Sequence, residues 1–137
     1  MNNTAETDGG AIGILDSTVK VLEDSNFLKN TANDFGGVVY AQNSSIIMSD
    51  TVFEYSISGR SGGVLSAKNS SINISACSFT NNNASRKGGA LTVYTNSHLM
   101  ILNSTLMHNA ASDSGRALYL AETSKSIIID NSRFVTT

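Results

Sequence analysis

Pairs of glycine residues return along this chain at a nearly constant interval. Each pair precedes a short apolar run, an Asn-Ser or Asp-Ser step, a second apolar run and usually a phenylalanine. Successive first glycines lie 26 or 27 residues apart, in Gly9-Gly10, Gly36-Gly37, Gly62-Gly63, Gly88-Gly89 and the degenerate fifth pair Gly115-Arg116. Self-similarity with a period of about 20–50 residues is typical of solenoids and repeat arrays. The repeat therefore constrains the fold more strongly than any local propensity does.

The apolar run after each glycine pair alternates between apolar and variable residues. Its second and fourth positions are apolar in every repeat, as Val39 and Ala41 are in the second one. This period of two predicts a β-strand with one buried face. The variable third position, predicted to face outward, holds Gly13, Tyr40, Ser66, Thr92 and Tyr119. Because two rungs separate the tyrosines, we expect no continuous aromatic platform there.

The second apolar run repeats the alternation and predicts further inward columns. One column holds Val19, Ile46, Ile72, Leu99 and Ile127, and the next holds Val21, Met48, Ile74, Ile101 and Ile129. The inward direction continues through a small-residue column, Ser25, Thr51, Cys77, Ser104 and Ser132, to a large-residue column, Phe27, Phe53, Phe79, Leu106 and Phe134. We therefore expect one ring or leucine to fill the same corner of every turn.

Three strand-like segments in each repeat predict an all-β fold, a right-handed parallel β-helix of about five coils with three strands per coil. The handedness follows the general rule for parallel crossovers. Asn or Asp followed by Ser marks the first bend, at Asp16, Asn43, Asn69 and Asn96, where side chains can bond their own turn or stack along the axis. The chain contains no proline, as a fully paired ladder requires. Residues 1–137 form a single repeat domain in this interpretation.

Two tetrapeptides alternate in phase with the repeat. Gly9-Gly10-Ala11-Ile12 and Gly88-Gly89-Ala90-Leu91, with Phe27-Leu28-Lys29-Asn30 and Phe79-Thr80-Asn81-Asn82, resemble the GGA(I/L/V) and FxxN motifs of the chlamydial polymorphic outer membrane proteins. The resemblance implies a right-handed β-helix passenger region that is displayed on a cell surface and used in adhesion. It makes these motif residues candidate adhesion-type positions: Gly9, Gly10, Ala11, Ile12, Phe27, Asn30, Phe79, Asn82, Gly88, Gly89, Ala90 and Leu91. Val38, Val64 and Arg116 depart from the motif.

Composition excludes several classes of function. A net charge of −2 and a pI near 5.5 argue against nucleic acid or an anionic membrane as partner. The single Cys77 excludes an intrachain disulfide. We expect no signal peptide in this segment, and no apolar run is long enough to insert into a membrane. Because Asn3-Thr4-Ala5 repeats Asn30-Thr31-Ala32, we expect a fragment of a longer array from a cell-surface or extracellular protein.

Candidate catalytic residues are few. Asp24 and Asp50 share a column and Asp130 adds a third carboxylate, so a fragment of a pectate-lyase-like, carbohydrate-active β-helix is the alternative to an adhesin. His98 and His108 fall in outward columns, and Cys77 falls in the inward small-residue column. We predict no catalytic residue, metal site or cofactor, and a passive structural stalk remains a third reading.

The loops before the glycine pairs carry the variable charges. They hold Asp34, Arg60, Arg86, Lys87 and Asp113. Variation on one edge of a regular scaffold is how repeat proteins form binding surfaces. The expected partner is therefore a protein or cell-surface ligand, with a glycan as one candidate. Uncapped coils at the two ends would also permit end-to-end self-association.

Overall fold

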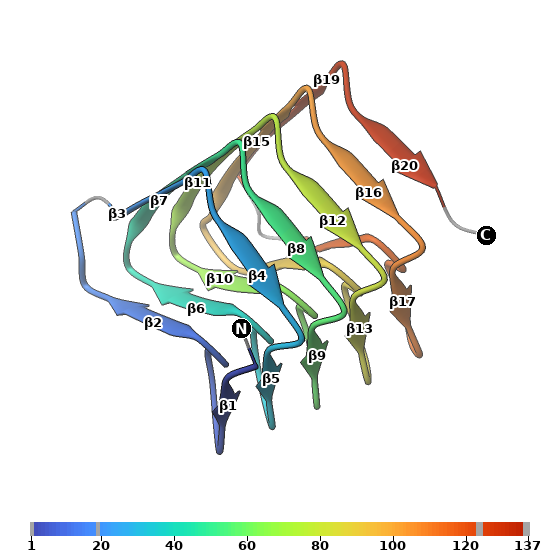
Figure 1. Cartoon of the computed structure of the whole chain (residues 1–137). Helices are drawn as coiled ribbons and strands as arrows, with labels where there is room; N and C mark the ends of the chain where they lie inside the picture. The colour runs from blue at the N-terminus through green and yellow to red at the C-terminus, as the bar shows by residue number, and fades with distance from the viewer. Residues whose placement is uncertain (1, 19, 123–124, 136–137) are drawn as a thin grey trace.

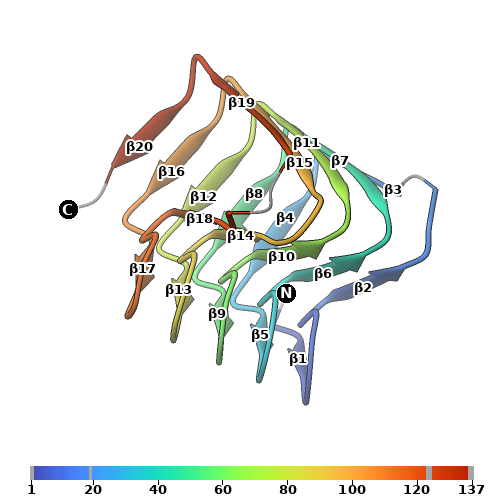
Figure 2. The ribbon, with the colours of Figure 1, turned by 180° about the vertical axis from the view of Figure 1, so that it is seen from behind.

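In the computed structural model, which describes residues 2–18, 20–122 and 125–135, the chain winds into a parallel β-solenoid. We number the coils by their glycine pairs, so that coil 1 begins at Gly9, coil 2 at Gly36, coil 3 at Gly62, coil 4 at Gly88 and coil 5 at Gly115. Figures 1 and 2 show the coils stacked in chain order, with β2 at one end of the stack and β18 at the other. All strand pairings join one coil to the next and are parallel, for example Leu65 beside Val39 and Leu91.

Four five-stranded sheets run along the stack. Sheet 1 follows the glycine pairs and consists of β2 (Ile12–Leu15), β6 (Val39–Gln42), β10 (Leu65–Lys68), β14 (Leu91–Val93) and β18 (Leu118–Leu120). Sheet 2 consists of β3 (Lys20–Glu23), β7 (Ser45–Ser49), β11 (Ser71–Ser75), β15 (His98–Leu102) and β19 (Ser126–Asp130). Sheet 3 consists of β4 (Asn26–Leu28), β8 (Val52–Glu54), β12 (Ser78–Thr80), β16 (Thr105–Met107) and β20 (Arg133–Val135).

The fourth sheet corrects the prediction of three strands per coil. It is built from two-residue strands, β1 (Thr4–Ala5), β5 (Thr31–Ala32), β9 (Ile57–Ser58), β13 (Asn83–Ala84) and β17 (Ala110–Ala111). These pairs lie between the phenylalanine corner and the next glycine pair, where the chain is extended just long enough to join the ladder. Two residues carry no recognisable alternation, so the strand is invisible in the sequence pattern.

One device builds the three corners that join sheets 1, 2, 3 and 4. A residue with positive φ, such as Asn43 at 52°, precedes a small polar residue. The side chain of that polar residue accepts the backbone N–H of its equivalent one coil earlier: Ser17 N–H donates to Ser44 Oγ at 3.2 Å, and Ser56 N–H donates to Asn82 Oδ1 at 2.9 Å. Because a bend takes these N–H groups out of the strand ladders, the side chain supplies the acceptor that a buried donor needs.

The predicted amide stacking at the first corner is confirmed. Asn43 Nδ2 donates to Asp16 Oδ1 at 2.8 Å, and Asn69 Nδ2 donates to Asn43 Oδ1 at 2.7 Å. The local bond of the turn comes instead from the serine that follows, since Ser44 Oγ donates to the carbonyl of Gln42 at 2.7 Å. The two residues of the Asn-Ser step therefore have different roles: the amide bonds along the solenoid axis, and the hydroxyl bonds within the bend.

The glycine pair forms the fourth corner, and its two residues are glycine for different reasons. Gly62 has a φ of +71°, which side chains rarely tolerate. A Cβ on Gly63 would overlap the carbonyl oxygen of Gly89 in the next coil and lie 2.9 Å from the backbone of Asn83. The first glycine thus permits the bend, and the second permits the close approach of neighbouring coils.

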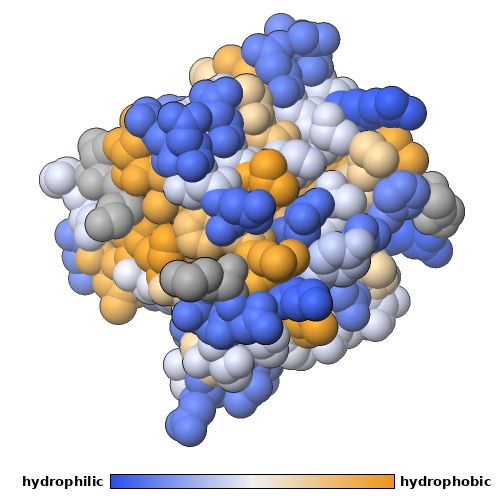
Figure 3. All heavy atoms as spheres, viewed as in Figure 1, coloured by the Kyte–Doolittle hydropathy of each residue, from blue (hydrophilic) through white to orange (hydrophobic). Residues whose placement is uncertain are grey.

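The interior is a continuous apolar column that runs through all coils. Phe27, Phe53 and Phe79 stack with ring centroids 5.3 and 4.8 Å apart and with interplanar angles of 9°, as one ring per turn predicts. Cys77 is buried in the small-residue column, as expected. Figure 3 shows apolar side chains gathered on the left of this face, on the side where β2 lies in Figure 1, with hydrophilic side chains around them. In coil 5 the predicted register holds, but Phe134 is 39% exposed at the edge of the stack.

The predicted register of the second apolar run is wrong in coil 1. Val21 is 47% exposed, whereas Leu22 is 8% exposed and pairs with Met48, so Leu22 faces the interior. Coil 1 has one more residue than coil 2 between its first corner and Lys20, and this shifts the alternation by one. The other predicted inward residue of this coil, Val19, lies outside the described residues.

Candidate binding groove

Two outward-facing residues of sheet 1 are buried. Ser66 and Thr92 occupy the variable third column of β10 and β14, yet they are 1% and 0% exposed. Their side chains point away from the apolar interior because neighbouring strand residues alternate in direction. Ser66 lies among aromatic side chains on the outside of the solenoid, whereas Thr92 Oγ1 donates to the carbonyl of Lys87 at 3.0 Å.

Four half-buried aromatic side chains form a continuous row across the outer face of sheet 1. The ring of Phe35 lies 6.4 Å from that of Tyr40 and 6.2 Å from that of Tyr94, the second contact being edge-to-face. Tyr94 in turn lies 6.5 Å from Tyr119. Such separations are those of interacting aromatic pairs. The expectation that Tyr40 and Tyr119 belong to no continuous aromatic platform is therefore wrong, because rings from two corners bridge the gap.

The bridging residues come from irregular positions of the repeat. Phe35 precedes the glycine pair of coil 2, in a column that holds Ser61 and Lys87 in the next two coils. Tyr94 belongs to a one-residue insertion after β14, since the pairing spacing between coils 3 and 4 rises from 26 at Val93 to 27 at His98. In the sequence, only this change of spacing indicates that Tyr94 departs from the repeat.

The aromatic row borders an open groove with a volume of about 300 Å³. Its lining is Phe35, Tyr40, Ser66, Lys68, Tyr94 and Thr95. The hydroxyl of Ser66 is buried and has no hydrogen-bond partner among the described residues. Leaving a buried hydroxyl unpaired costs about 1–3 kcal/mol. The groove therefore combines apolar walls with one unsatisfied polar group, the combination expected of a ligand site.

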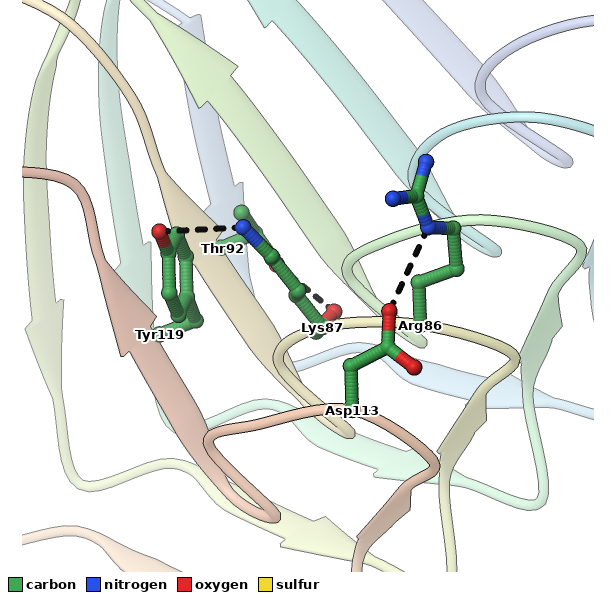
Figure 4. A network of polar contacts seen from close by, with 5 residues as sticks. All are labelled: Arg86, Lys87, Thr92, Asp113 and Tyr119. Atoms are coloured by element: carbon green, nitrogen blue, oxygen red, sulfur yellow. Dashed lines mark hydrogen bonds and ion pairs between the residues drawn. The ribbon is translucent and has the colours of Figure 1, made fainter.

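Cations lie close to the aromatic row. Lys87 Nζ lies 4.5 Å from the ring centroid of Tyr119 and donates a hydrogen bond to its hydroxyl at 3.2 Å (Figure 4). The guanidinium of Arg60 lies 5.6 Å from the centroid of Phe35. Lys68 lines the groove itself at the end of β10. A cation over an aromatic face contributes roughly 0.5–1 kcal/mol at an exposed site.

Tyr40 lines the groove and carries a titratable hydroxyl. Burial raises its pKa above the ordinary value, and the nearby Asp8 carboxylate and Tyr94 add to this shift. Its hydroxyl donates to Gln42 Oε1 at 3.0 Å, and Asp8 Oδ1 accepts the backbone N–H of Phe35 at 3.0 Å. Tyr40 therefore stays neutral across the physiological range and presents a fixed hydroxyl beside the aromatic row.

The variable charges of the loops mostly neutralise one another. Arg60 Nε lies 3.3 Å from Asp34, and Arg86 Nε lies 3.3 Å from Asp113 in the pair drawn in Figure 4. All four side chains are partly or largely exposed, so each pair contributes at most about 1 kcal/mol. Lys87, between these loops and sheet 1, has no carboxylate partner within the part of the chain that the structure describes.

The candidate motif residues build the scaffold. Asn30, Phe79, Asn82, Gly89, Ala90 and Leu91 are fully buried, and the equivalent residues of coil 1 lie at the open edge of the same columns. Asn82 accepts the Ser56 N–H and donates its amide to the carbonyl of Phe53 at 3.0 Å. A partner that approaches from outside would therefore meet the loop and aromatic residues and not the motif side chains.

The carboxylates considered for catalysis do not converge. Asp24 and Asp50 occupy the second corner with φ of 44° and 48°, and that column continues as Ala76. Asp130 lies at the end of β19, three coils away from Asp50, where its carboxylate accepts the N–H of Asn131. Asp24 and Asp50 are therefore neighbours in one corner column, and Asp130 lies apart from them.

The remaining candidates are also dispersed. His98 and His108 are exposed, as expected, and burial raises the pKa of the Cys77 thiol, which makes it a poor nucleophile. Across residues 2–18, 20–122 and 125–135, no three His, Cys, Asp or Glu side chains approach one another as metal ligands would. The same ranges contain no helix with the length and apolar character to cross a membrane.

Two segments of the chain match the Chlamydia polymorphic membrane protein repeat, residues 24–42 and 76–93. Each segment contains the same structural unit, which runs from the second corner through a phenylalanine strand and a glycine pair to a strand of sheet 1. Together they cover just over a quarter of the chain. No curated protein and no solved structure matches the chain significantly.

Proposed function

We propose that this solenoid, which carries two repeats of the polymorphic membrane protein type, is an adhesin-type segment that attaches its parent protein to another protein or cell. The repeat type supports display of the parent protein at an outer membrane or cell surface. The aromatic groove on sheet 1 supports a binding role, because there the regular scaffold is modified by aromatic side chains that do not recur from coil to coil.

The main support for this proposal is that the aromatic residues of the groove do not recur, unlike the rest of the repeat. Corner and core positions recur in every coil, whereas Phe35 and Tyr94 each occur in one coil only and meet across the surface. Half-buried aromatic side chains with polar tips are enriched at protein interfaces. Binding at this face leaves the interior ladder untouched, so that the scaffold holds the site rigid while a partner docks.

Cell attachment to immobilised protein tests the proposal. We expect saturable attachment to wild-type chain and its loss in Tyr94→Ala, because this change removes two ring contacts and one wall of the groove. Tyr55→Ala is the matched control, since Tyr55 is 49% exposed at a corner outside the groove. Circular dichroism should show both variants folded.

The alternatives make different predictions in the same assay. A passive stalk would give no saturable attachment with any variant, and its only requirement would be the regular scaffold. A carbohydrate-active fragment would release reducing ends from a polysaccharide, and Asp24→Asn with Asp50→Asn would abolish that release. Equal attachment by wild type and Tyr94→Ala would remove the groove from the proposed function.

A further inference from the structure

The walls of the aromatic groove are flat rings that meet nearly at a right angle. Tyr94 meets Phe35 edge-to-face, so the two rings form adjoining walls and not a closed stack. The C–H groups of a sugar ring pack against aromatic surface, while its hydroxyls require hydrogen-bond partners. The Tyr40 hydroxyl at one side is such a partner, and the unpaired hydroxyl of Ser66 lies beneath the aromatic row at the base.

The size of the groove sets the size of the occupant. About 300 Å³ lies at the lower limit of ordinary ligand pockets. This volume accommodates one six-membered sugar ring with its substituents, whereas a protein helix would need a longer trough. Ser66 lines the groove at its base, where it is 1% exposed and lies beneath the aromatic row.

The charges around the groove further restrict the kind of ligand. Lys68 lines the groove and forms no ion pair with any described carboxylate, and Lys87 holds a second unpaired ammonium beside Tyr119. The carboxylate that acts on Tyr40 is that of Asp8, at the glycine-pair end of sheet 1. Lys68 stands at the opposite end of its strand, where it favours an anionic substituent.

From these observations we propose that the groove binds a single pyranose ring that carries a carboxylate, with the ring against Tyr94 and Phe35 and the carboxylate beside Lys68. Uronic acids and sialic acids share this chemistry. The inference rests on the proposed attachment function and specifies its ligand as an acidic glycan of the target surface. An acidic peptide is the competing occupant, and the test below distinguishes it.

The experiment is an NMR titration of the ¹⁵N-labelled chain with three methyl glycosides, those of glucuronic acid, N-acetylneuraminic acid and glucose. We expect the backbone signals of Ser66, Lys68 and Tyr94 to shift saturably with at least one acidic sugar. The affinity for the neutral sugar should be about two- to fivefold lower, as the energy of a solvent-exposed ion pair predicts. Whichever acidic sugar binds identifies the source of the carboxylate.

Two variants separate the contributions of ring and charge. Lys68→Gln should reduce the affinity for the acidic sugar to that for glucose, whereas Tyr94→Ala should weaken binding of all sugars at least tenfold, because it removes a central aromatic contact. Tyr55→Ala should bind like wild type. Lys68 is exposed, so Lys68→Gln keeps the test informative if Tyr94→Ala folds poorly.

The outcomes distinguish the ligand from the function. If no sugar shifts the groove signals but Tyr94→Ala still abolishes cell attachment, the ligand is not an acidic glycan, and the proposed attachment function is retained. Competition of attachment by an acidic peptide and not by a uronate would assign the groove to a protein partner and overturn the proposal. Equal affinity for acidic and neutral sugars would refute the role of Lys68.

Discussion

Replacement of Gly63 by alanine probes the contact on which the stacking of coils depends. Gly63 has no positive φ, so alanine meets no backbone strain of its own there. Its new Cβ would overlap the carbonyl oxygen of Gly89 and lie 2.9 Å from the backbone of Asn83. Both obstacles are backbone atoms of neighbouring coils or strands, which cannot rotate away as a flexible side chain can.

The magnitude follows from what must open to admit the methyl group. The corner hydrogen bonds from Gly62 N to Lys87 O at 3.0 Å and from Gly63 N to Gly88 O at 3.1 Å would lengthen as the coils separate. Overpacking a close-packed region costs about 1–3 kcal/mol, and each hydrogen bond lost adds about 0.5–1.5 kcal/mol. We therefore expect Gly63→Ala to lower the free energy of unfolding by roughly 2–6 kcal/mol.

Gly13→Ala is the matched control on the same sheet. A Cβ at Gly13 has no atom within 4 Å, and its strand position requires no positive φ. Alanine should stabilise this position by about 0.4–1 kcal/mol through the unfolded chain. Urea unfolding followed by far-UV circular dichroism measures both variants. A single hydrogen bond contributes about 0.5–1.5 kcal/mol. If the free energy of unfolding of Gly63→Ala lies within about 1 kcal/mol of the wild-type value, the close-approach argument is refuted.

Three further predictions concern the core, the open edge and the buried thiol. Phe53→Ala should cost about 3–5 kcal/mol in urea unfolding, because Phe53 is fully buried between two stacked rings; Phe27→Ala, which loses one ring contact at the edge, should cost less. We propose that end-to-end association is opposed by the Cβ of Arg116, at the second position of a glycine pair; in sedimentation equilibrium Arg116→Gly should associate at lower concentration than wild type, whereas Arg116→Ala, which keeps the Cβ, should not. Because the folded state raises the pKa of Cys77 above its ordinary 9.0, the stability that the neutral thiol contributes is present below that pH and lost as the pH rises through the folded value; the urea midpoint of wild type should therefore fall between pH 7.5 and 9.5 more than that of Cys77→Ser, and equal falls would contradict the raised pKa.

Much of the scaffold could be predicted from residue order because solenoid stacking converts sequence period directly into neighbours. Residues 26 or 27 positions apart lie side by side, so the phenylalanine column and the Asn column were recognisable before any contact was known. The alternation after each glycine pair likewise predicted which side of sheet 1 faces inward. These features depend only on period and on local conformational preference.

Errors arose where one residue was added or where too few residues carried a pattern. The additional residue before Lys20 reversed the inward assignment of Val21 and Leu22, because a shift of one residue moves a strand's side chains to the opposite face. The two-residue strands of the fourth sheet, such as Thr31–Ala32, were missed because ladder hydrogen bonds define them and side-chain alternation does not.

The sequence by itself determined the winding of this protein, since glycine at two successive corner positions and apolar residues at every second strand position are needed wherever like coils stack. Only the tertiary structure decided the groove. Phe35 and Tyr94 are 59 residues apart and lie in corners of different coils, yet their rings meet at 6.2 Å over Ser66. The direction of a corner side chain depends on the three-dimensional path of its turn, which no periodicity specifies, so this surface emerges only once the coils are stacked.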